Sequence, residues 1–406
     1  MKTQVINGLN QQWGAIMENA VRKVNKERNT NIEALKLLAI LLIIIFHIVQ
    51  TLTDNPNVTK TFWVWNATED VTTIILSIIR GFGVLGNSIF FMCSAYFLLN
   101  SKKSNKKKII YMIIEIFSVS ILILLISQIP LWKINISKEI RFQSLFPTTY
   151  STNWYLTCYI LLYLICPILN YLIKNINKKQ LLVWVSFMSF LFIGINFMNS
   201  GAYFSNNLIL WITIYLIMAY IKLYCDKFSK NNKAIYIILF SSMVLHLILM
   251  IATNELGLHH KYFYDKVMKW NTNNNPFFIA IAMSLVFIAI NKKPYVNKFL
   301  NKVASYSLLI YIIHENIILR TYVRPQLINF IYAKWGYNRL FLEIFILAIF
   351  IYVCSIILSI IYTFLFKRLL GYLTEKIYNL LCKFGNENKI IMNCLFEKEY
   401  ILFVTS

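Results

Sequence analysis

The segment that decides how the chain is interpreted is Asn31-Ile-Glu-Ala-Leu-Lys-Leu-Leu-Ala-Ile-Leu-Leu-Ile-Ile-Ile-Phe-His47. It begins with polar residues, continues as an aliphatic run and ends at a histidine. In an α-helix the step from Lys36 to His47 turns through about 1100°, about 20° more than three full turns. Both side chains therefore lie on one face, roughly 16 Å apart along the axis. A cation and an imidazole at two depths of one apolar helix predict a path along it.

The composition indicates a membrane protein. Of 406 residues, 58% are hydrophobic and only 14% are charged, whereas soluble domains have about 25% charged residues. The mean hydropathy is +0.59. The apolar runs are continuous rather than alternating, which argues against a porin-like barrel and predicts an all-α polytopic helical bundle. The net charge of +23 would suggest nucleic acid for a soluble protein, but here we expect a lipid bilayer as partner and no nucleic acid.

Ten apolar runs approach the ~20 residues that a spanning helix needs. We expect a cytoplasmic polar segment over 1–30, a membrane domain over 31–366 and a cytoplasmic tail over 367–406 that includes an interfacial helix. Val71–Ile79 is apolar but short, so it is expected at the interface, and Pro325 is expected where the ninth span ends. The predicted spans are 34–52, 80–100, 109–131, 153–173, 180–198, 206–225, 234–252, 276–291, 303–323 and 340–366.

Lysine and arginine residues predict which side each loop faces. With the N-terminus inside, the inner segments hold more than twice as many of them as the outer segments, and every inner segment is basic. This distribution predicts N-in and C-in. The first thirty residues lack a signal-peptide core, so the first span is expected to act as an uncleaved anchor in the plasma membrane. The seven cysteines are scattered without a CxxC pair, which argues against disulfides and structural zinc.

Ionisable residues inside spans are costly and indicate functional sites. The predicted orientation places Lys36 at the inner end of the first span and His47 in its outer half. Several other polar residues fall at the outer ends or in the outer halves of their predicted spans. We expect these to meet with His47 in one outward-facing polar cavity: Arg80, Asn153, His314, Glu315 and Glu343.

Each candidate also has a purely structural explanation. His47 could form a hydrogen bond to a neighbouring helix, and Lys36 could extend its side chain to the inner headgroups. Arg80 and Arg320 could anchor the outer surface. His246 has no charged neighbour within a turn and is expected to be a satisfied packing residue.

The cluster Lys102-Lys-Ser-Asn-Lys-Lys-Lys108 is first of all an inner anchor. It would also suit an anionic, phosphate-bearing ligand or anionic lipids. No Walker loop, GxGxxG, GxSxG or HExxH motif is present. His259 and His260 lie in an outer loop without further ligands, so no metal is expected.

Four stretches, in order over roughly residues 30–366, together resemble the acyltransferase-3 superfamily of integral membrane O-acyltransferases. Lys36 and His47 match its Arg/Lys-x10-His signature in the first span. The other three are similar to its "G-V-x-x-F-F-x-x-S-G-[FY]-L-L", "WFL…LY…P" and "S-Y-x-x-Y-x-x-H" patterns. They are Val84-Leu-Gly-Asn-Ser-Ile-Phe-Phe-Met-Cys-Ser-Ala-Tyr-Phe-Leu-Leu99, Asn153-Trp-Tyr-Leu with Tyr159, Leu162, Tyr163 and Pro167, and Ser305-Tyr-Ser-Leu-Leu-Ile-Tyr-Ile-Ile-His314.

The chain departs from the family pattern at two places. Ala95 stands where the family has Gly. The Arg-x-x-Arg pattern appears as Lys103 and Lys106, and lysine cannot make the bidentate phosphate contact of arginine. The resemblance implies transfer of an acyl group, commonly acetyl from acetyl-CoA, to a hydroxyl of an extracytoplasmic glycan. It assigns Lys36, Lys103 and Lys106 to the acyl-CoA.

These expectations fit the residues. The roughly 16 Å from Lys36 to His47 is comparable to an extended phosphopantetheine arm. His47 could act as general base on the acceptor hydroxyl, and a transient acyl-histidine relay is equally compatible. Glu315 or Glu343 could orient the imidazole. His314 is a further catalytic candidate, Arg80 and Asn153 are oxyanion candidates, and Trp154 is expected to contact the substrate.

Three functions remain open from the sequence. The first is a polysaccharide O-acetyltransferase. The Ile, Asn and Lys bias suggests a bacterial AT-rich genome, and Ile312–Pro325 resembles the branch associated with capsule or cell-wall polysaccharide and its lipid-linked precursors. The second is a polysaccharide or lipid-linked-oligosaccharide transporter or flippase, which would not need a base at His47. The third is a glycan polymerase or ligase, which would more typically carry large charged outer loops.

Overall fold

The computed structural model describes residues 28–99, 101, 105–129, 134–149, 153–199 and 206–387, with side chains up to 383. Every regular element in these ranges is a helix. The first part of the chain forms α2 (Thr30–Asp54), α3 (Val71–Ile79), α4 (Gly81–Leu98), α5 (Lys106–Ser127), α6 (Lys138–Leu145), α7 (Trp154–Asn175), α8 (Lys178–Ser189), η2 (Phe190–Ile195) and α9 (Asn196–Met198).

The second part forms α10 (Asn207–Tyr224), α11 (Asp226–Ser229), α12 (Asn232–His259), η3 (Val267–Trp270), α13 (Pro276–Asn291), α14 (Lys298–Ala304), α15 (Ser307–His314), η4 (Leu319–Val323), α16 (Arg324–Trp335) and α17 (Leu340–Glu387). Within the described residues, eight helical segments are long and apolar enough to cross a membrane. The prediction of an all-α polytopic bundle is therefore confirmed.

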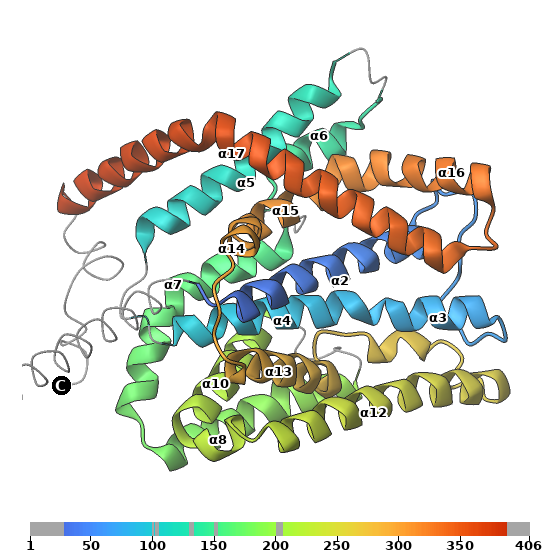
Figure 1. Ribbon diagram of the computed structural model, residues 1–406, viewed down its shortest axis with the longest axis horizontal. Coiled ribbons are helices and arrows are strands. Elements are labelled where there is room, and N and C mark those ends of the chain that lie inside the picture. The colour runs from blue at the N-terminus through green and yellow to red at the C-terminus, as the bar shows by residue number, and fades with distance from the viewer. Residues whose placement is uncertain are drawn as a thin grey trace, which may run out of the picture.

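Helix α2 lies at the centre of the bundle (Figure 1). It packs against α4 and α13 on one side and α17 on the other, while α13 also packs against α12. Its aliphatic residues fill the core, with Ala39 and Ile48 fully buried and Ile40 at 1% exposure. Burial of this kind is unusual for a helix at the edge of a bundle. The stretch that predicted a path along one helix thus forms the central helix.

Glycines permit the closest contact, which is between α2 and α4. A Cβ on Gly86 would lie 2.6 Å from the backbone oxygen of Ala39, and one on Gly83 would lie 2.4 Å from the ring of Phe46. Small residues spaced along one helix let the backbone of a neighbour approach closely. This contact fixes α4 against the segment of α2 that leads to His47.

The observed helix limits differ from the predicted span limits at three places. Val71–Ile79 is not a separate short segment: with α4 it forms one candidate span over Val71–Leu98. Arg80, the charged residue within this longer span, is 6% exposed and bonded to Asp54. Its charge therefore does not have to lie in water. Helix α17 continues past 366 to Glu387, because no Pro or Gly-Pro break stops it there.

The predicted span 303–323 is not one continuous helix. Helix α15 ends at His314, and a π-helical turn begins at Leu319. Asn316 starts the next segment, and its side chain accepts a hydrogen bond from the backbone N–H of Ile318 at 3.0 Å. Pro325 lies in the first turn of α16 rather than at an exit. Discontinuous helices in membrane proteins leave backbone groups available where they line a cavity.

Candidate active site

Two cavities lie at opposite ends of the α2/α4 pair. The first, about 610 Å³, is lined by the start of α2 and the end of α4, including Lys36 and Cys93. The second, about 570 Å³, is lined by the end of α2 and the start of α4, including His47 and Gly83. We call them the Lys36 cavity and the His47 cavity. Each end of the stretch that predicted a path therefore borders a cavity.

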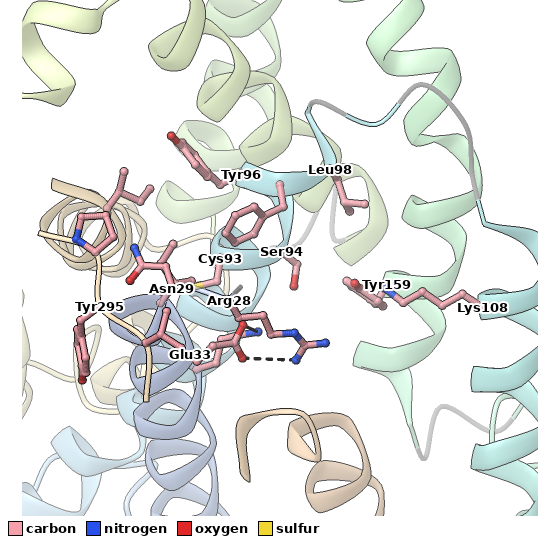
Figure 2. Close-up of a pocket in the computed structure, with 16 residues that line it drawn as sticks. Arg28, Asn29, Glu33, Cys93, Ser94, Tyr96, Leu98, Lys108, Tyr159 and Tyr295 are labelled. Carbon is pink, nitrogen blue, oxygen red and sulfur yellow. Dashed lines mark hydrogen bonds and ion pairs between the residues drawn. The ribbon is translucent and has the colours of Figure 1, made fainter. Parts of the chain in front are cut away.

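The Lys36 cavity is cationic. Figure 2 shows Arg28 and Lys108 reaching into it from opposite sides, with Glu33 on α2. The Lys36 Nζ lies 2.8 Å from a Glu33 oxygen, and Arg28 lies 3.8 Å from the other oxygen. Three cations against one carboxylate leave an excess of positive charge. Such a lining suits an anionic ligand.

The His47 cavity contains a histidine–carboxylate pair. The Nε2 of His47 lies 3.2 Å from Oε2 of Glu315, and its Nδ1 lies 3.1 Å from Oε1 of Gln50. The side chains of His47 and Glu315 are 12% and 3% exposed. With Glu315 ionised, a proton on Nε2 is bonded to it, and Nδ1 is then the basic nitrogen of the neutral ring. Two oxygens in line with both ring nitrogens also stabilise a protonated ring.

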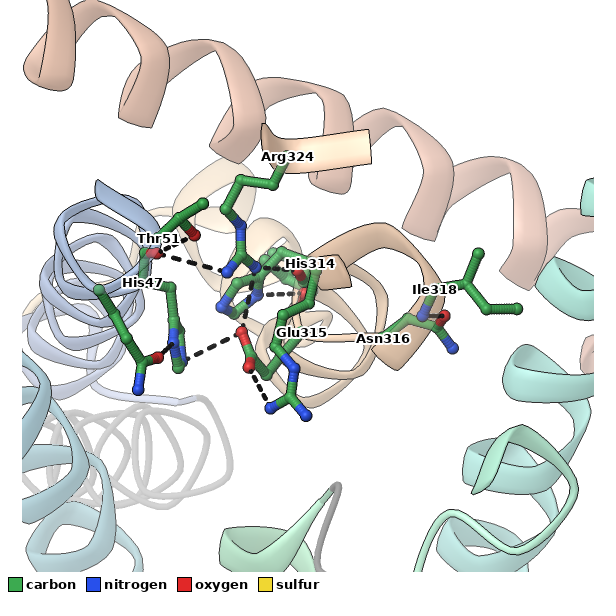
Figure 3. A network of polar contacts seen from close by, with 10 residues as sticks. His47, Thr51, His314, Glu315, Asn316, Ile318 and Arg324 are labelled. Carbon is green, nitrogen blue, oxygen red and sulfur yellow. Dashed lines mark hydrogen bonds and ion pairs between the residues drawn. The ribbon is translucent and has the colours of Figure 1, made fainter. Parts of the chain in front are cut away.

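Two arginines hold the carboxylate of Glu315. Arg320 donates to Oε1 at 3.0 Å, and Arg324 donates to Oε2 at 3.1 Å. Figure 3 shows Arg324 above Glu315, between His47 and His314. Arg324 also donates to the backbone oxygens of His314 at 2.7 Å and His47 at 3.4 Å. One buried guanidinium therefore connects the broken helix to α2 and fixes Glu315 facing His47.

His314 lies behind this pair. Its Nδ1 lies 2.8 Å from the backbone oxygen of Ile310, so Nδ1 carries the proton. Its Nε2 is buried and has no hydrogen-bond partner among the described residues. The ring centroids of His314 and His47 are 5.7 Å apart. His314 thus offers a second basic nitrogen close to His47, although it is not part of the cavity wall.

Arg80 also lines the His47 cavity. It donates to Asp54 Oδ1 at 2.7 Å and to the Thr53 hydroxyl. Its guanidinium carbon lies 5.2 Å from the ring centre of Trp65 and 5.9 Å from that of Phe46. Its Nε is buried without a partner. Arg80 is therefore a cation held rigidly beside the space that His47 faces.

Comparison with known proteins identifies the family. The model Acyl_transf_3, described as "Acyltransferase domain", matches residues 29–366. The chain belongs to the acyltransferase-3 family. The resemblance predicted from four short stretches is thus confirmed, and the protein is a multi-pass membrane acyltransferase. Neither the curated proteins nor the solved structures contain a match to it.

The predicted donor residues of this acyltransferase are only partly brought together. Lys36 lines the cavity that carries its name. Lys106 begins α5 and is not part of that lining, whereas Lys108, two residues further on, is. Lys103 lies outside the described residues. The helical start at Lys106 turns Lys108, rather than Lys106, toward the cavity.

The predicted acceptor-side residues separate into two groups. His47, Arg80, Glu315 and Trp154 line one cavity. Asn153 does not line it: it precedes the first turn of α7, with its Oδ1 buried and unpartnered. A single cavity containing all six predicted polar residues is therefore not formed.

Glu343 also lies outside the His47 cavity wall. It is in the first turn of α17 and 4% exposed, and both of its carboxylate oxygens are buried without a hydrogen-bond partner among the described residues. The sequence predicts that both ring nitrogens of His246 have hydrogen-bond partners, but only one of them has a partner among the described residues. Its Nδ1 lies 3.2 Å from Asn275 Nδ2, while its Nε2 is buried and unpartnered.

The ligand atoms of His47, His314 and Glu315 lie within 4.8 Å of one another, which is close enough to bind a metal ion. The charges nearby oppose it. Both oxygens of Glu315 already accept from guanidinium groups, and a divalent cation would lie beside two arginines. The same three residues suit proton transfer better.

Sequence reasoning missed four residues of these sites: Arg28, Gln50, Lys108 and Arg324. Arg324 had one signal, because it follows Arg320 by four residues and would share its helix face. Gln50 likewise follows His47 by three residues on α2. Arg28 and Lys108 had no signal beyond belonging to basic clusters.

Proposed function

We propose that the protein transfers an acyl group, in the first instance acetyl, from cytoplasmic acyl-CoA to a hydroxyl of an extracytoplasmic polysaccharide or its lipid-linked precursor. The observation that carries this proposal is the arrangement of the two cavities. One is cationic, the other contains a histidine–carboxylate pair, and both open along α2. With N-in orientation the donor enters from the cytoplasm and the acceptor from outside.

The Lys36 cavity fits the donor in charge. Arg28, Lys36 and Lys108 would hold its phosphates, with Glu33 keeping Lys36 in place at 2.8 Å. Lysine is a point charge for phosphate rather than a bidentate clamp, so only Arg28 can pair with two oxygens at once. The donor supplies an activated acyl thioester.

His47 would act as the general base. Its Nδ1 takes the proton of the acceptor hydroxyl while the hydroxyl oxygen attacks the thioester carbonyl carbon. The C–O bond forms, the C–S bond breaks, and the proton leaves His47 with the thiolate. Glu315 stabilises the ring while it is protonated, because its carboxylate remains 3.2 Å from Nε2. Gln50, whose Oε1 lies 3.1 Å from Nδ1, accepts a hydrogen bond from that nitrogen once the ring is protonated.

Arg80 would stabilise the oxyanion. It is 6% exposed and held by Asp54 and two aromatic rings. A fixed cation beside a forming negative charge needs no reorganisation during the reaction. In this proposal Arg80 thus has an electrostatic role in the cavity lining.

The test uses the purified protein in vesicles with radiolabelled acetyl-CoA and the surface polysaccharide of the source cell. We expect His47→Gln to lower transfer at least about 100-fold, the lower bound for general-base catalysis. His246→Gln is the matched control, because this histidine is also buried but lies between α12 and α13. Its transfer rate should remain within a few-fold of wild type.

The same variants are then tested in cells. Proton NMR of the surface polysaccharide should show loss of O-acetyl groups with His47→Gln and normal polysaccharide export. Retained acetylation would refute the role of His47. Lost export with normal acetyl content on the remaining polymer would support the transporter alternative instead.

A further inference from the structure

One part of the lining of the His47 cavity, which we call its wall, has an unusual composition. It combines amide side chains with aromatic ones and has no charged residue without a partner. The amides are Asn87 on α4, Asn207 on α10 and the run Asn271, Asn273 and Asn274 beside Thr272. The aromatics are Trp65 and Trp154. The proposed acyl transfer gives a role to Arg80 beside this wall, but none to its amides or indoles.

Buried polar atoms without partners are concentrated there. Among the described residues, the cavity-lining Arg80, Asn87, Asn271 and Thr272 each carry one, at Nε, Oδ1, Oδ1 and Oγ1 respectively. Such atoms are rare in folded proteins, and each costs free energy until a partner is supplied. Four on the wall of one cavity indicate that the partner is a ligand or water in it.

Two of these side chains are free to turn toward a ligand. Asn87 Oδ1 and Thr272 Oγ1 lack partners, so rotation into the cavity would gain a hydrogen bond for each. Asn271 is instead anchored, because its NH₂ donates to the backbone oxygen of Ser77 at 2.6 Å. This hydrogen bond identifies the Oδ1 of Asn271 as the acceptor atom.

The chemistry of these atoms selects the ligand. Amide oxygens accept hydrogen bonds, so Asn87 and Asn271 need O–H or N–H donors. A carboxylate or phosphate has only acceptor oxygens and cannot serve them. Arg80 and Arg320 are each already paired with a carboxylate, at 2.7 Å to Asp54 and 3.0 Å to Glu315, so the described lining of the cavity carries no unpaired positive charge that would select an anionic sugar.

A sugar ring meets all of these demands. Its hydroxyls both donate and accept, so they can satisfy the amide oxygens, the Thr272 hydroxyl and the Nε of Arg80 together. Its C–H face can lie against an aromatic side chain such as Trp65, which is 40% exposed. From the amides, the unpartnered atoms and the indoles, we propose that this wall is a subsite for a neutral sugar ring of the acceptor.

This inference rests on the proposed function for the identity of the ligand as acceptor, but its test measures binding. The probes are a neutral N-acetylhexosamine tetrasaccharide and a uronate-containing tetrasaccharide of equal length. Each is titrated into the full-length protein in detergent by calorimetry. Wild type should bind the neutral probe at least tenfold more tightly than the uronate probe. Equal binding, or tighter binding of the uronate, would overturn the proposal.

Two kinds of variant locate the site. Asn87→Leu and Thr272→Val should each weaken binding of the neutral probe about fivefold to tenfold, a tenfold loss being about 1.4 kcal/mol. Thr272→Ser, which restores the hydroxyl, should regain most of the loss. Asn291→Leu is the control, because Asn291 bonds to Ser229 and Asn232 at the far end of α13. Unchanged binding in Asn87→Leu and Thr272→Val, with unchanged thermal unfolding, would place the sugar elsewhere.

The two proposals can fail separately. His47→Gln should still bind the neutral tetrasaccharide while losing acyl transfer. Sugar binding without any acyl transfer by wild type would refute the proposed function and leave the subsite standing. Acyl transfer by wild type that is insensitive to the Asn87 and Thr272 variants would refute the subsite alone.

Discussion

At the scale of single residues, Arg324 has the largest structural role in the site. Its side chain is 5% exposed, and it bonds to a carboxylate oxygen and to two backbone oxygens. One of these belongs to His314, where α15 ends and helical carbonyls lose their usual partners. Arg324 therefore satisfies the broken helix and positions Glu315 at the same time.

Replacing this arginine should be far more damaging than replacing its neighbour. Arg324→Gln leaves Glu315 short of one buried cation and is expected to lower the free energy of unfolding by about 3–5 kcal/mol. Arg320→Gln removes an equally short contact to Glu315, but the Arg320 side chain is 36% exposed, so we expect a loss below about 1 kcal/mol. Thermal and denaturant unfolding in detergent measures both. Equal losses would contradict the role assigned to Arg324.

What the sequence predicts at this scale depends on whether a residue acts along its own helix. Lys36 and His47 share α2, so their common face follows from helical geometry alone. The pairing of His47 with Glu315 requires the distance between α2 and the end of α15, which no local pattern contains. From the sequence, Glu343 is as good a candidate for this role as Glu315, and only the packing of α17 shows that it lies elsewhere.

At the scale of elements, the position of His47 depends on how closely α2 and α4 approach. Gly86 lies against the backbone oxygen of Ala39 and the side chain of Ile43. The backbone oxygen cannot move without displacing α2 itself. The family pattern has glycine near the end of this helix as well, where this chain has Ala95, which is fully buried.

Gly86→Ala is expected to destabilise the protein. The new Cβ would lie 2.6 Å from Ala39 O and 2.7 Å from Ile43 Cγ1, and overpacking of this kind costs about 1–3 kcal/mol. Gly371→Ala is the matched control, since a Cβ there meets nothing within 4 Å. It should stabilise α17 by up to about 1 kcal/mol through helix propensity. Unfolding in detergent should therefore shift in opposite directions, and a shift in the same direction would refute the close contact.

Helix existence was predictable and helix continuity was not. Apolar length identifies the spans because each needs ~20 residues to cross the bilayer. No Pro or Gly in the sequence predicts the break after His314. The break depends on Asn316 and the distant Arg324, which satisfy the freed backbone groups. In the same way, the sequence predicts that Arg80 marks the end of a span, and only the structure shows that Asp54 pairs with its charge.

At the scale of the whole molecule, the predicted orientation gives the two cavities their functions. Lys108 lies at the Lys36 cavity and Lys261 lies in the loop after α12, and both are exposed. If the N-terminus is inside, the first faces the cytoplasm and the second faces outward.

Cysteine labelling tests this orientation. In intact cells a membrane-impermeant maleimide should label Lys261→Cys and not Lys108→Cys, and in inverted vesicles the pattern should reverse. The unsubstituted chain is the control, because it contains free cysteines of its own. Labelling of Lys108→Cys from outside would reverse the proposed direction of acyl transfer.

The aliphatic section of α2 between the cavities also forms a barrier to ions. Ile40, Ile43 and Ile44 are each no more than 2% exposed, and they fill the interval of roughly 16 Å between Lys36 and His47. A hydrated ion or proton would have to cross this interval without solvation, at a cost of several kcal/mol. Without this barrier, ions could leak across the membrane through two cavities that reach toward each other from its two sides. If the proposed acyl transfer takes place across the membrane, the same isoleucines that hold the bundle together would keep the proton gradient intact during it.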